Sequence, residues 1–157
     1  MLRPPITVTA TIRPNQDRIA RVAPRVEGRI ISVAANLGDT VKAGQSLAVL
    51  DSLAIGEAQS ALQQALSSQR VAQSDFKRAE SLSAEEIIPQ REFLRAKSEL
   101  EKASSSLRAA EDRLRLLGAS AKSGTGASTF ALNTPLTGTV IQKTAIVGEL
   151  GTPAAPL

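Results

Sequence analysis

The first part of the chain alternates apolar and polar positions in short runs. Residues 6–12 alternate over seven positions, a period of two that predicts a half-buried β-strand. Residues 18–26 form a second extended stretch, in which Pro24 suits an edge or the start of a strand. Further strands are predicted at 29–33 and 46–50. Turns that contain glycine separate these last runs, as chain reversals in small β-domains require. The pattern predicts a small β-module at the start of the chain.

From Ile55 onward the spacing of the apolar positions becomes longer. Apolar and small residues recur at intervals of three and four, broken only by the polar Gln69, which is the heptad pattern of packed helices. The two predicted strips are Ile55, Ala58, Leu62, Ala65, Gln69, Ala72, Phe76 and Ala79, and then Phe93, Ala96, Leu100, Ala103, Leu107, Ala110, Leu114 and Leu117. Because only residues 83–88 form the reversal between them, the two helices should run antiparallel.

Residues at the expected ends of the helices agree with this hairpin. Asp51 or Ser52 can cap the first helix. Pro89 can open the second helix, since a proline in the first turn sacrifices no hydrogen bond. Gly118 follows the second helix at the position where a helix C-terminus favours glycine.

The β-runs on the two sides of the hairpin are related by an internal repeat. In the first copy Gly38 lies ten residues after Gly28, and Gly148 lies ten residues after Gly138 in the second. A leucine follows nine residues after the second glycine in both copies, at Leu47 and Leu157. We therefore expect the two repeats to pair with each other across the inserted hairpin.

The expected fold class is α+β, a lipoyl- or biotinyl-like β-module split by a long antiparallel α-helical hairpin. Partial β-barrel strands are expected at the N-terminus. The expected divisions are these strands at 1–22, a first lipoyl-like half at 23–51, the hairpin at 52–118, a linker at 119–128 and a second lipoyl-like half at 129–157.

The composition argues against catalysis and against most metal sites. The chain has no Cys and no His, so it lacks the commonest general base and the commonest transition-metal ligand. Glu80, Glu85 and Glu86 gather near the reversal, but three surface glutamates are usually solvated. The net charge is +4, and the lysines and arginines are mostly spread among carboxylates along the helices. This distribution does not favour nucleic-acid binding. We expect a protein that is not an enzyme, with no cofactor and no metal site.

The reversal of the hairpin carries the candidate binding residues. Arg78 and Leu82 are four apart and share one face of the first helix. Ile87 and Ile88 add apolar side chains where a thin hairpin has little core to cover them, and exposed apolar groups at an extremity often mark a contact. The alternative is that these side chains fold into a small cap over the turn. The polar outer face of the first helix over 60–74 is either solvated or packed against other helices.

Three groups of residues resemble one known family. They are NQDR and VAPRVEG at 15–18 and 22–28, GDTVKAGQ at 38–45, and GEAQS at 56–60. Together with the split module, they resemble the periplasmic adaptor subunits of tripartite RND efflux pumps, the HlyD-like membrane fusion proteins. The likeness is to the heavy-metal, CzcB-like branch and covers 15–157. It implies that the chain is the hairpin and lipoyl-like portion of a longer adaptor, with signal or anchor segments elsewhere.

The resemblance also implies a function and a set of partners. Such an adaptor is non-enzymatic, lies in the periplasm at the inner membrane, and links a proton-driven inner-membrane RND transporter to a TolC-like outer-membrane channel. It forms a ring, hexameric in the pump, and in this branch serves the efflux of metal cations. Two alternatives remain open at this point: a lipoyl or biotinyl carrier domain with Lys42 as the nearest lysine, or a coiled-coil scaffold.

At the tip, this family commonly has an arginine, a leucine four residues later and a serine seven residues beyond that. Arg78 and Leu82 match the first two positions, and Pro89 stands in place of the serine. The resemblance therefore implies that the tip, with Arg78, Leu82, Ile87 and Ile88, contacts the outer-membrane channel.

Overall fold

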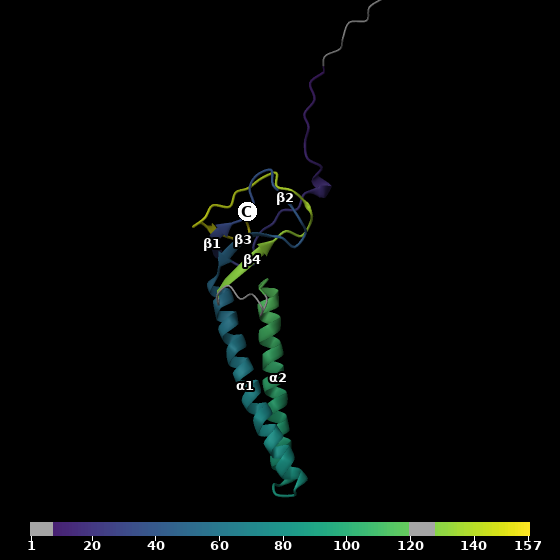
Figure 1. Ribbon diagram of the computed structural model, residues 1–157, viewed down its shortest axis with the longest axis vertical. Coiled ribbons are helices and arrows are strands. Elements are labelled where there is room, and N and C mark those ends of the chain that lie inside the picture. Colours follow the sequence, from purple (N-terminus) through teal and green to yellow (C-terminus); the bar gives the residue numbers. More distant parts are fainter. Residues whose placement is uncertain (1–7, 120–127) are drawn as a thin grey trace, which may run out of the picture.

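The structure, a computed structural model, describes residues 8–119 and 128–157. Figure 1 shows a small β-module from which a two-helix hairpin projects, in agreement with the predicted α+β class. The elements, in chain order, are a 3₁₀ turn at Gln16–Arg18, β1 Gly28–Val33, β2 Thr40–Val41, β3 Ser46–Asp51, α1 Leu53–Ala84, α2 Gln90–Leu116, β4 Thr129–Asn133, β5 Gly138–Thr139 and β6 Leu150–Gly151.

The strands form two sheets that join the two repeats. One sheet has the order β4-β3-β1-β6 and the other contains β2 and β5. Every ladder is antiparallel, and β1 with β6, β2 with β5 and β3 with β4 each pair a strand from before the hairpin with one from after it. The predicted pairing of the repeats is confirmed. The hairpin is thus an insertion into one β-module and does not link two independent ones.

The backbone hydrogen bonds between the repeats follow an approximate two-fold symmetry. The amide of Gly38 donates to the carbonyl of Val140 at 2.8 Å, and the amide of Gly148 donates to the carbonyl of Ile30 at 2.8 Å. A shift of 110 residues converts one bond into the other with the halves exchanged. Gly38 and Gly148 also share a positive φ, 88° and 91°, a conformation that side chains with a Cβ disfavour. The repeated glycines therefore mark equivalent turns.

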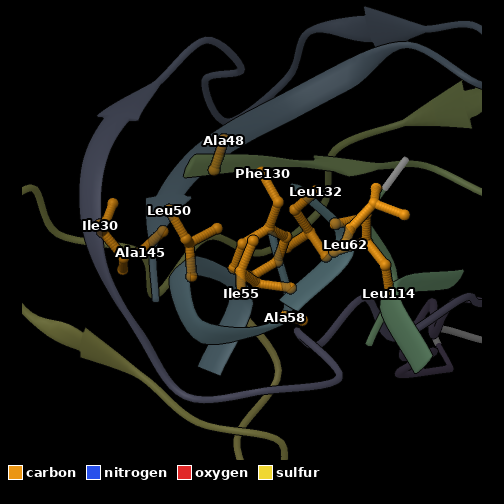
Figure 2. Packing of buried hydrophobic residues seen from close by; sticks show 11 residues of the cluster. Ile30, Ala48, Leu50, Ile55, Ala58, Leu62, Leu114, Phe130, Leu132 and Ala145 are labelled. Atoms are coloured by element: carbon orange, nitrogen blue, oxygen red, sulfur yellow. The ribbon is translucent and has the colours of Figure 1, made fainter. Parts of the chain in front are cut away.

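The core lies where the hairpin leaves the β-module. Leu50 and Phe130 from the sheet pack with Ile55 and Leu62 of α1 and with Leu114 of α2, and all five side chains are buried. Figure 2 shows these side chains converging between the strands and the helix bases. The first turns of α1 and the last turns of α2 therefore belong to the core of the module, which fixes the direction of the hairpin.

Gly56 allows α1 to pass close to the start of the second repeat. A Cβ at this position would lie 3.3 Å from the Cβ of Ser128, closer than side chains normally pack. The backbone amide of Ser52 donates to the carbonyl of Ser128 at 2.9 Å. Ser52 occupies the N-cap position of α1, as predicted, but its side chain makes no capping hydrogen bond.

Pro89 is displaced by one residue from its expected place. It is the cap residue before Gln90, with ψ of 145°, and not the first helical residue. The displacement costs no hydrogen bond, because the N–H that proline lacks would be unsatisfied at either position. Its carbonyl accepts the amide hydrogen of Glu92 at 2.9 Å, so it still opens the helix.

The N-terminal segment differs from its prediction. The strand expected at 6–12 is absent over its described residues, 8–12, and the second extended stretch, 18–26, forms no strand and shares only Arg18 with the turn at Gln16–Arg18. The expected β-barrel strands at 1–22 are thus not formed over residues 8–22. Alternation alone does not make a strand, because the backbone groups of a strand need a partner, and the first described residues of this segment run away from the module (Figure 1). Most of the expected linker, residues 120–127, lies outside the described part of the chain.

Candidate docking site at the hairpin tip

The seam between α1 and α2 positions the tip. Every residue of the two predicted strips is buried or half-buried, whereas the polar outer face of α1, including Gln63 and Ser67, is exposed. Near the far end, the rings of Phe76 and Phe93 pack with their centroids 5.7 Å apart and their planes tilted by 38°. Such a tilted aromatic pair adds stabilisation beyond its buried area. The two helices are therefore joined up to the last turns before the reversal.

A defined backbone motif terminates α1 at the tip. The amide of Glu86 donates to the carbonyl of Ser83 at 3.1 Å, and the amide of Ile87 donates to the carbonyl of Leu82 at 2.9 Å. These two bonds form a Schellman motif, which satisfies the last carbonyls of a helix. It requires a left-handed residue, and Glu86 has a φ of 57°. The motif sets the places of Leu82 and Ile87.

The same motif ends α2 at the other end of the hairpin. The amides of Gly118 and Ala119 donate to the carbonyls of Arg115 and Leu114 at 3.0 and 3.2 Å. The left-handed residue here is Gly118, with a φ of 87°. The residue type predicts the motif at Gly118. No such signal exists at Glu86, because glutamate rarely adopts this conformation.

The four predicted tip residues gather at the end of α1 and in the turn that follows. Arg78 is exposed, and Ile87 is 61% exposed. Leu82 and Ile88 are half-buried. Two apolar side chains are therefore partly covered, as in a cap, and one apolar and one cationic side chain are exposed to solvent.

Arg78 has a partner that sequence reasoning did not name. Its Nη1 lies 3.4 Å from Oδ1 of Asp75, three residues earlier on α1, and both side chains are more than half exposed. An exposed pair of this kind contributes little to stability. The spacing of an acid three residues before a base on a helix could have identified it. The guanidinium can exchange this weak contact for a carboxylate or carbonyl on another protein.

Metal binding, lysine modification and membrane insertion find no support in the described residues. Within residues 8–119 and 128–157, no three acidic side chains are arranged to hold a metal ion, and Glu80, Glu85 and Glu86 are each exposed. Lys42 lies in a turn of the β-module, where its carbonyl accepts the amide hydrogen of Gln45 at 2.9 Å, and not at the joint between the two halves where α1 begins. Neither α1 nor α2 is apolar enough over its length to cross a membrane.

Comparison with known proteins identifies the family. A family model described as the CzcB-like barrel-sandwich hybrid domain matches residues 18–155. The cobalt-zinc-cadmium resistance protein CzcB of Cupriavidus metallidurans is 34% identical over 138 residues, 88% of this chain and 26% of that protein. The cation efflux system protein CzcB of an Alcaligenes species gives the same values. The chain therefore spans about a quarter of the length of the curated relatives it matches.

Solved structures agree with this result. ZneB from Cupriavidus metallidurans has a TM-score of 0.67 and 32% identity, over 88% of this chain and 58% of that one. A MacA-MexA chimera containing the Pseudomonas aeruginosa MexA α-hairpin domain has a TM-score of 0.58 and 20% identity, over 84% of this chain and 41% of the chimera, and shows a shared fold. Since the family model covers most of the chain and the architecture agrees, the chain belongs to the family of CzcB-like barrel-sandwich hybrid domains.

Proposed function

We propose that this chain is the lipoyl-like and hairpin portion of a non-enzymatic adaptor in a tripartite efflux pump. The adaptor lies in the periplasm at the inner membrane. It links a proton-driven inner-membrane RND transporter to a TolC-like outer-membrane channel. Membership of the CzcB-like family supports the class, and the form of the hairpin supports the bridging role.

The observation that carries the proposal is an arm fixed at one end and exposed at the other. At the base, Ile55 and Leu114 are at most 1% exposed, so the hairpin cannot swing freely on the module. α1 has 32 residues, which at 1.5 Å per residue gives a length of about 48 Å. At the far end stand Arg78 and Ile87, both exposed. A rigid arm of this length is suited to span part of the distance between two membranes and to dock by its tip.

The adaptor acts in our proposal as a ring of six copies. The hairpins line the conduit side by side, and the outer face of α1 meets the neighbouring copy. Over residues 60–74 that face carries Arg70 as its only charge, so adjacent hairpins would repel one another weakly. The proposed cargo is a metal cation, as the names of the two curated relatives indicate for those proteins.

A chimera tests the proposal directly. Residues 18–155 replace the matching segment of CzcB from Cupriavidus metallidurans, and the chimera is expressed in a strain that lacks its own czcB. We expect growth in cobalt, zinc and cadmium to be restored toward the level given by the unaltered protein. A chimera that is exported and folded but gives no tolerance to any of these metals would contradict the proposal.

No specific observation favours the two alternatives. A lipoyl or biotinyl carrier presents its modified lysine at the joint between the halves, and here that joint holds Ser52, which is 3% exposed. Intact mass after expression in a lipoylating and biotinylating host should show no modification of Lys42. A coiled-coil scaffold without a transport role would fail in the chimera.

A further inference from the structure

Two exposed apolar side chains lie in the middle part of the hairpin. Val71 of α1 is 62% exposed and Leu94 of α2 is 53% exposed. The other large apolar side chains of the hairpin that are exposed to this degree lie at its base or at its tip, at Leu53, Leu116 and Ile87. A single exposed apolar residue is common on a protein surface, so the two are informative only through their positions relative to each other.

Val71 and Leu94 lie near the same level of the arm but on opposite faces of it. Because Phe76 packs against Phe93, a residue of α1 and a residue of α2 lie at the same level when their numbers add up to 169. Val71 is therefore four residues, or about 6 Å, away from the level of Leu94. Val71 precedes a seam residue, whereas Leu94 follows one. In an antiparallel pair of helices, these two positions lie on opposite sides of the plane through both helix axes.

Each helix has two outer rows of side chains, because residues seven apart line up along a helix whose seam repeats every seven residues. We name each row after one of its members. On α1, the Val71 row is Glu57, Gln64, Val71 and Arg78, and the Arg70 row is Gly56, Gln63, Arg70 and Lys77. On α2, the Leu94 row is Leu94, Glu101, Arg108 and Arg115, and the Arg95 row is Arg95, Lys102, Ala109 and Leu116.

A ring of copies brings these rows together in one of two ways. Rotational symmetry makes the contact head-to-tail, so α2 of one copy meets α1 of the next at matching levels. If the next copy is displaced toward one face of the hairpin, the Leu94 row meets the Val71 row. If it is displaced toward the other face, the Arg95 row meets the Arg70 row. Between its two rows α1 carries serines, Ser60, Ser67, Ser74 and Ser81, whose small size permits close approach in both cases.

The Leu94 and Val71 rows are complementary. Arg108 meets Glu57 with opposite charge, Leu94 meets Val71, and each pair differs in level by the same four residues. Arg108 and Glu57 take part in none of the ion pairs within the described part of the chain. Both groups are therefore available to a neighbouring copy.

The Arg95 and Arg70 rows repel each other. At the same difference in level, Arg95 meets Arg70 and Lys102 meets Gln63, and neither row contains a carboxylate. Lys102 is paired with Glu99 of its own helix, but Arg70 and Arg95 belong to none of the ion pairs of the described residues. One exposed charge pair contributes little by itself, but a ring repeats it at every contact, and placing like charges together disfavours the wrong arrangement.

We propose that neighbouring hairpins pack with the Leu94 row of one copy against the Val71 row of the next. The partner is a second copy of this chain, displaced toward the face of the hairpin on which Leu94 lies. The inference rests on the ring in the proposed function and goes beyond it, because it assigns the contacting rows and the direction of the displacement.

Crosslinking in the CzcB chimera tests the direction. The chain has no cysteine of its own. Val71→Cys with Leu94→Cys, treated in intact cells with a short bifunctional thiol reagent, should give a ladder of products beyond the dimer, because each copy then offers one thiol to each neighbour. Arg70→Cys with Arg95→Cys is the matched control, with the same difference in level on the other two rows, and should give no ladder. The chimera without added cysteines gives the background.

The outcomes separate the packing from the function. A ladder from the control pair, equal ladders from both pairs, or no ladder from the first pair in cells that keep metal tolerance would overturn the proposal. Tolerance of the unsubstituted chimera reports on the adaptor function, whereas the crosslinks report on the packing, so the two failures are distinguishable.

Charge exchange gives a second test in the same chimera. Glu57→Arg alone and Arg108→Glu alone should each lower the metal tolerance, and the double variant should recover most of it. Because Glu57 and Arg108 lie on opposite faces of one hairpin, this recovery can arise only between copies. Circular dichroism should show unchanged helicity in all three variants. Single variants with full tolerance, or a double variant without recovery, would overturn the proposed contact.

Discussion

Gly28 lies directly opposite Gly151 in the ladder between β1 and β6, and neither position has room for a side chain. A Cβ on Gly28 would stand 2.8 Å from the backbone oxygen of Asp51, and a Cβ on Gly151 would stand 2.9 Å from Cδ2 of Leu50. Leu50 is fully buried, so it could make room only by repacking within the core. The two repeats are thus held together at a point where only glycine fits on both strands.

Gly28→Ala should therefore destabilise the module, whereas the equivalent change in the second repeat should not. The added methyl group of Gly28→Ala meets backbone, which costs about 1 to 3 kcal/mol in an overpacked core. Gly138→Ala is the matched control, because its Cβ would lie 3.4 Å from a side-chain atom of Leu136, an ordinary contact. Urea unfolding monitored by circular dichroism measures both. Equal stabilities of the two variants would contradict the packing described here.

The two Schellman motifs predict changes of opposite sign. Glu86→Gly should stabilise the protein by up to about 1 kcal/mol, because a residue with a Cβ is strained in the left-handed region by about 1 to 2 kcal/mol and glycine recovers most of this despite its entropy. Gly118→Ala should destabilise by about 1 kcal/mol for the same reason. Thermal unfolding of both variants measures whether each change raises or lowers the stability. A loss of stability in Glu86→Gly would show that the Glu86 side chain supports the turn.

Sequence patterns predicted those parts of the fold whose partners lie within the repeats and the hairpin. The glycine spacing of Gly28 and Gly38 with Gly138 and Gly148 gave the pairing of the halves, since equivalent turns fold alike. The heptad strips predicted which faces of the two helices pack against each other. The prediction of a strand was wrong for residues 8–12, because alternation carries no information on whether a partner strand is present.

The candidate site was predicted in part for related reasons. Helical spacing placed Arg78 and Leu82 on one face, and the reversal placed Ile87 and Ile88 at the end. The left-handed conformation of Glu86 could not be predicted, because glutamate rarely adopts it. The contribution of the helix bases to the core of the module could not be predicted either, because the heptad pattern continues unchanged along α1.

The tip residues should be required for docking but not for folding. In the CzcB chimera, we expect Arg78→Asp and Leu82→Ser each to abolish metal tolerance, since a small contact concentrates its energy in few residues. Helicity should be unchanged in both variants, and the stability of Arg78→Asp should fall by no more than about 1 kcal/mol, because Arg78 makes an exposed ion pair. Growth assays and circular dichroism check the two halves of this prediction.

Lys102→Asp is the control for charge reversal on the hairpin. Lys102 is paired with Glu99 three residues earlier and is 69% exposed, against 70% for Arg78, but it lies midway along α2. Tolerance should persist in this variant. If Lys102→Asp fails as Arg78→Asp does, the requirement is for charge along the hairpin and not for the tip.

Shortening the arm should abolish function without unfolding the module. Removal of residues 63–76 and 93–106 takes two heptads from each helix, keeps the register of the seam and the tip residues Arg78 and Leu82, and shortens the arm by about 21 Å. The core residues Ile55, Leu62 and Leu114 remain. We expect a folded protein by NMR and no metal tolerance in the chimera. Full tolerance with the short arm would show that reach is not the role of the hairpin.

The central claim, that the tip of this hairpin docks on an outer-membrane channel, is tested most directly by site-specific photocrosslinking. A photoreactive amino acid replaces Ile87, which is 61% exposed at the tip, or Lys102 as the mid-hairpin control, in the functional chimera. Irradiation of intact cells should join the Ile87 position to the outer-membrane channel, while the Lys102 position should give no such product. Absence of the channel product at Ile87 in cells that retain metal tolerance would contradict the account.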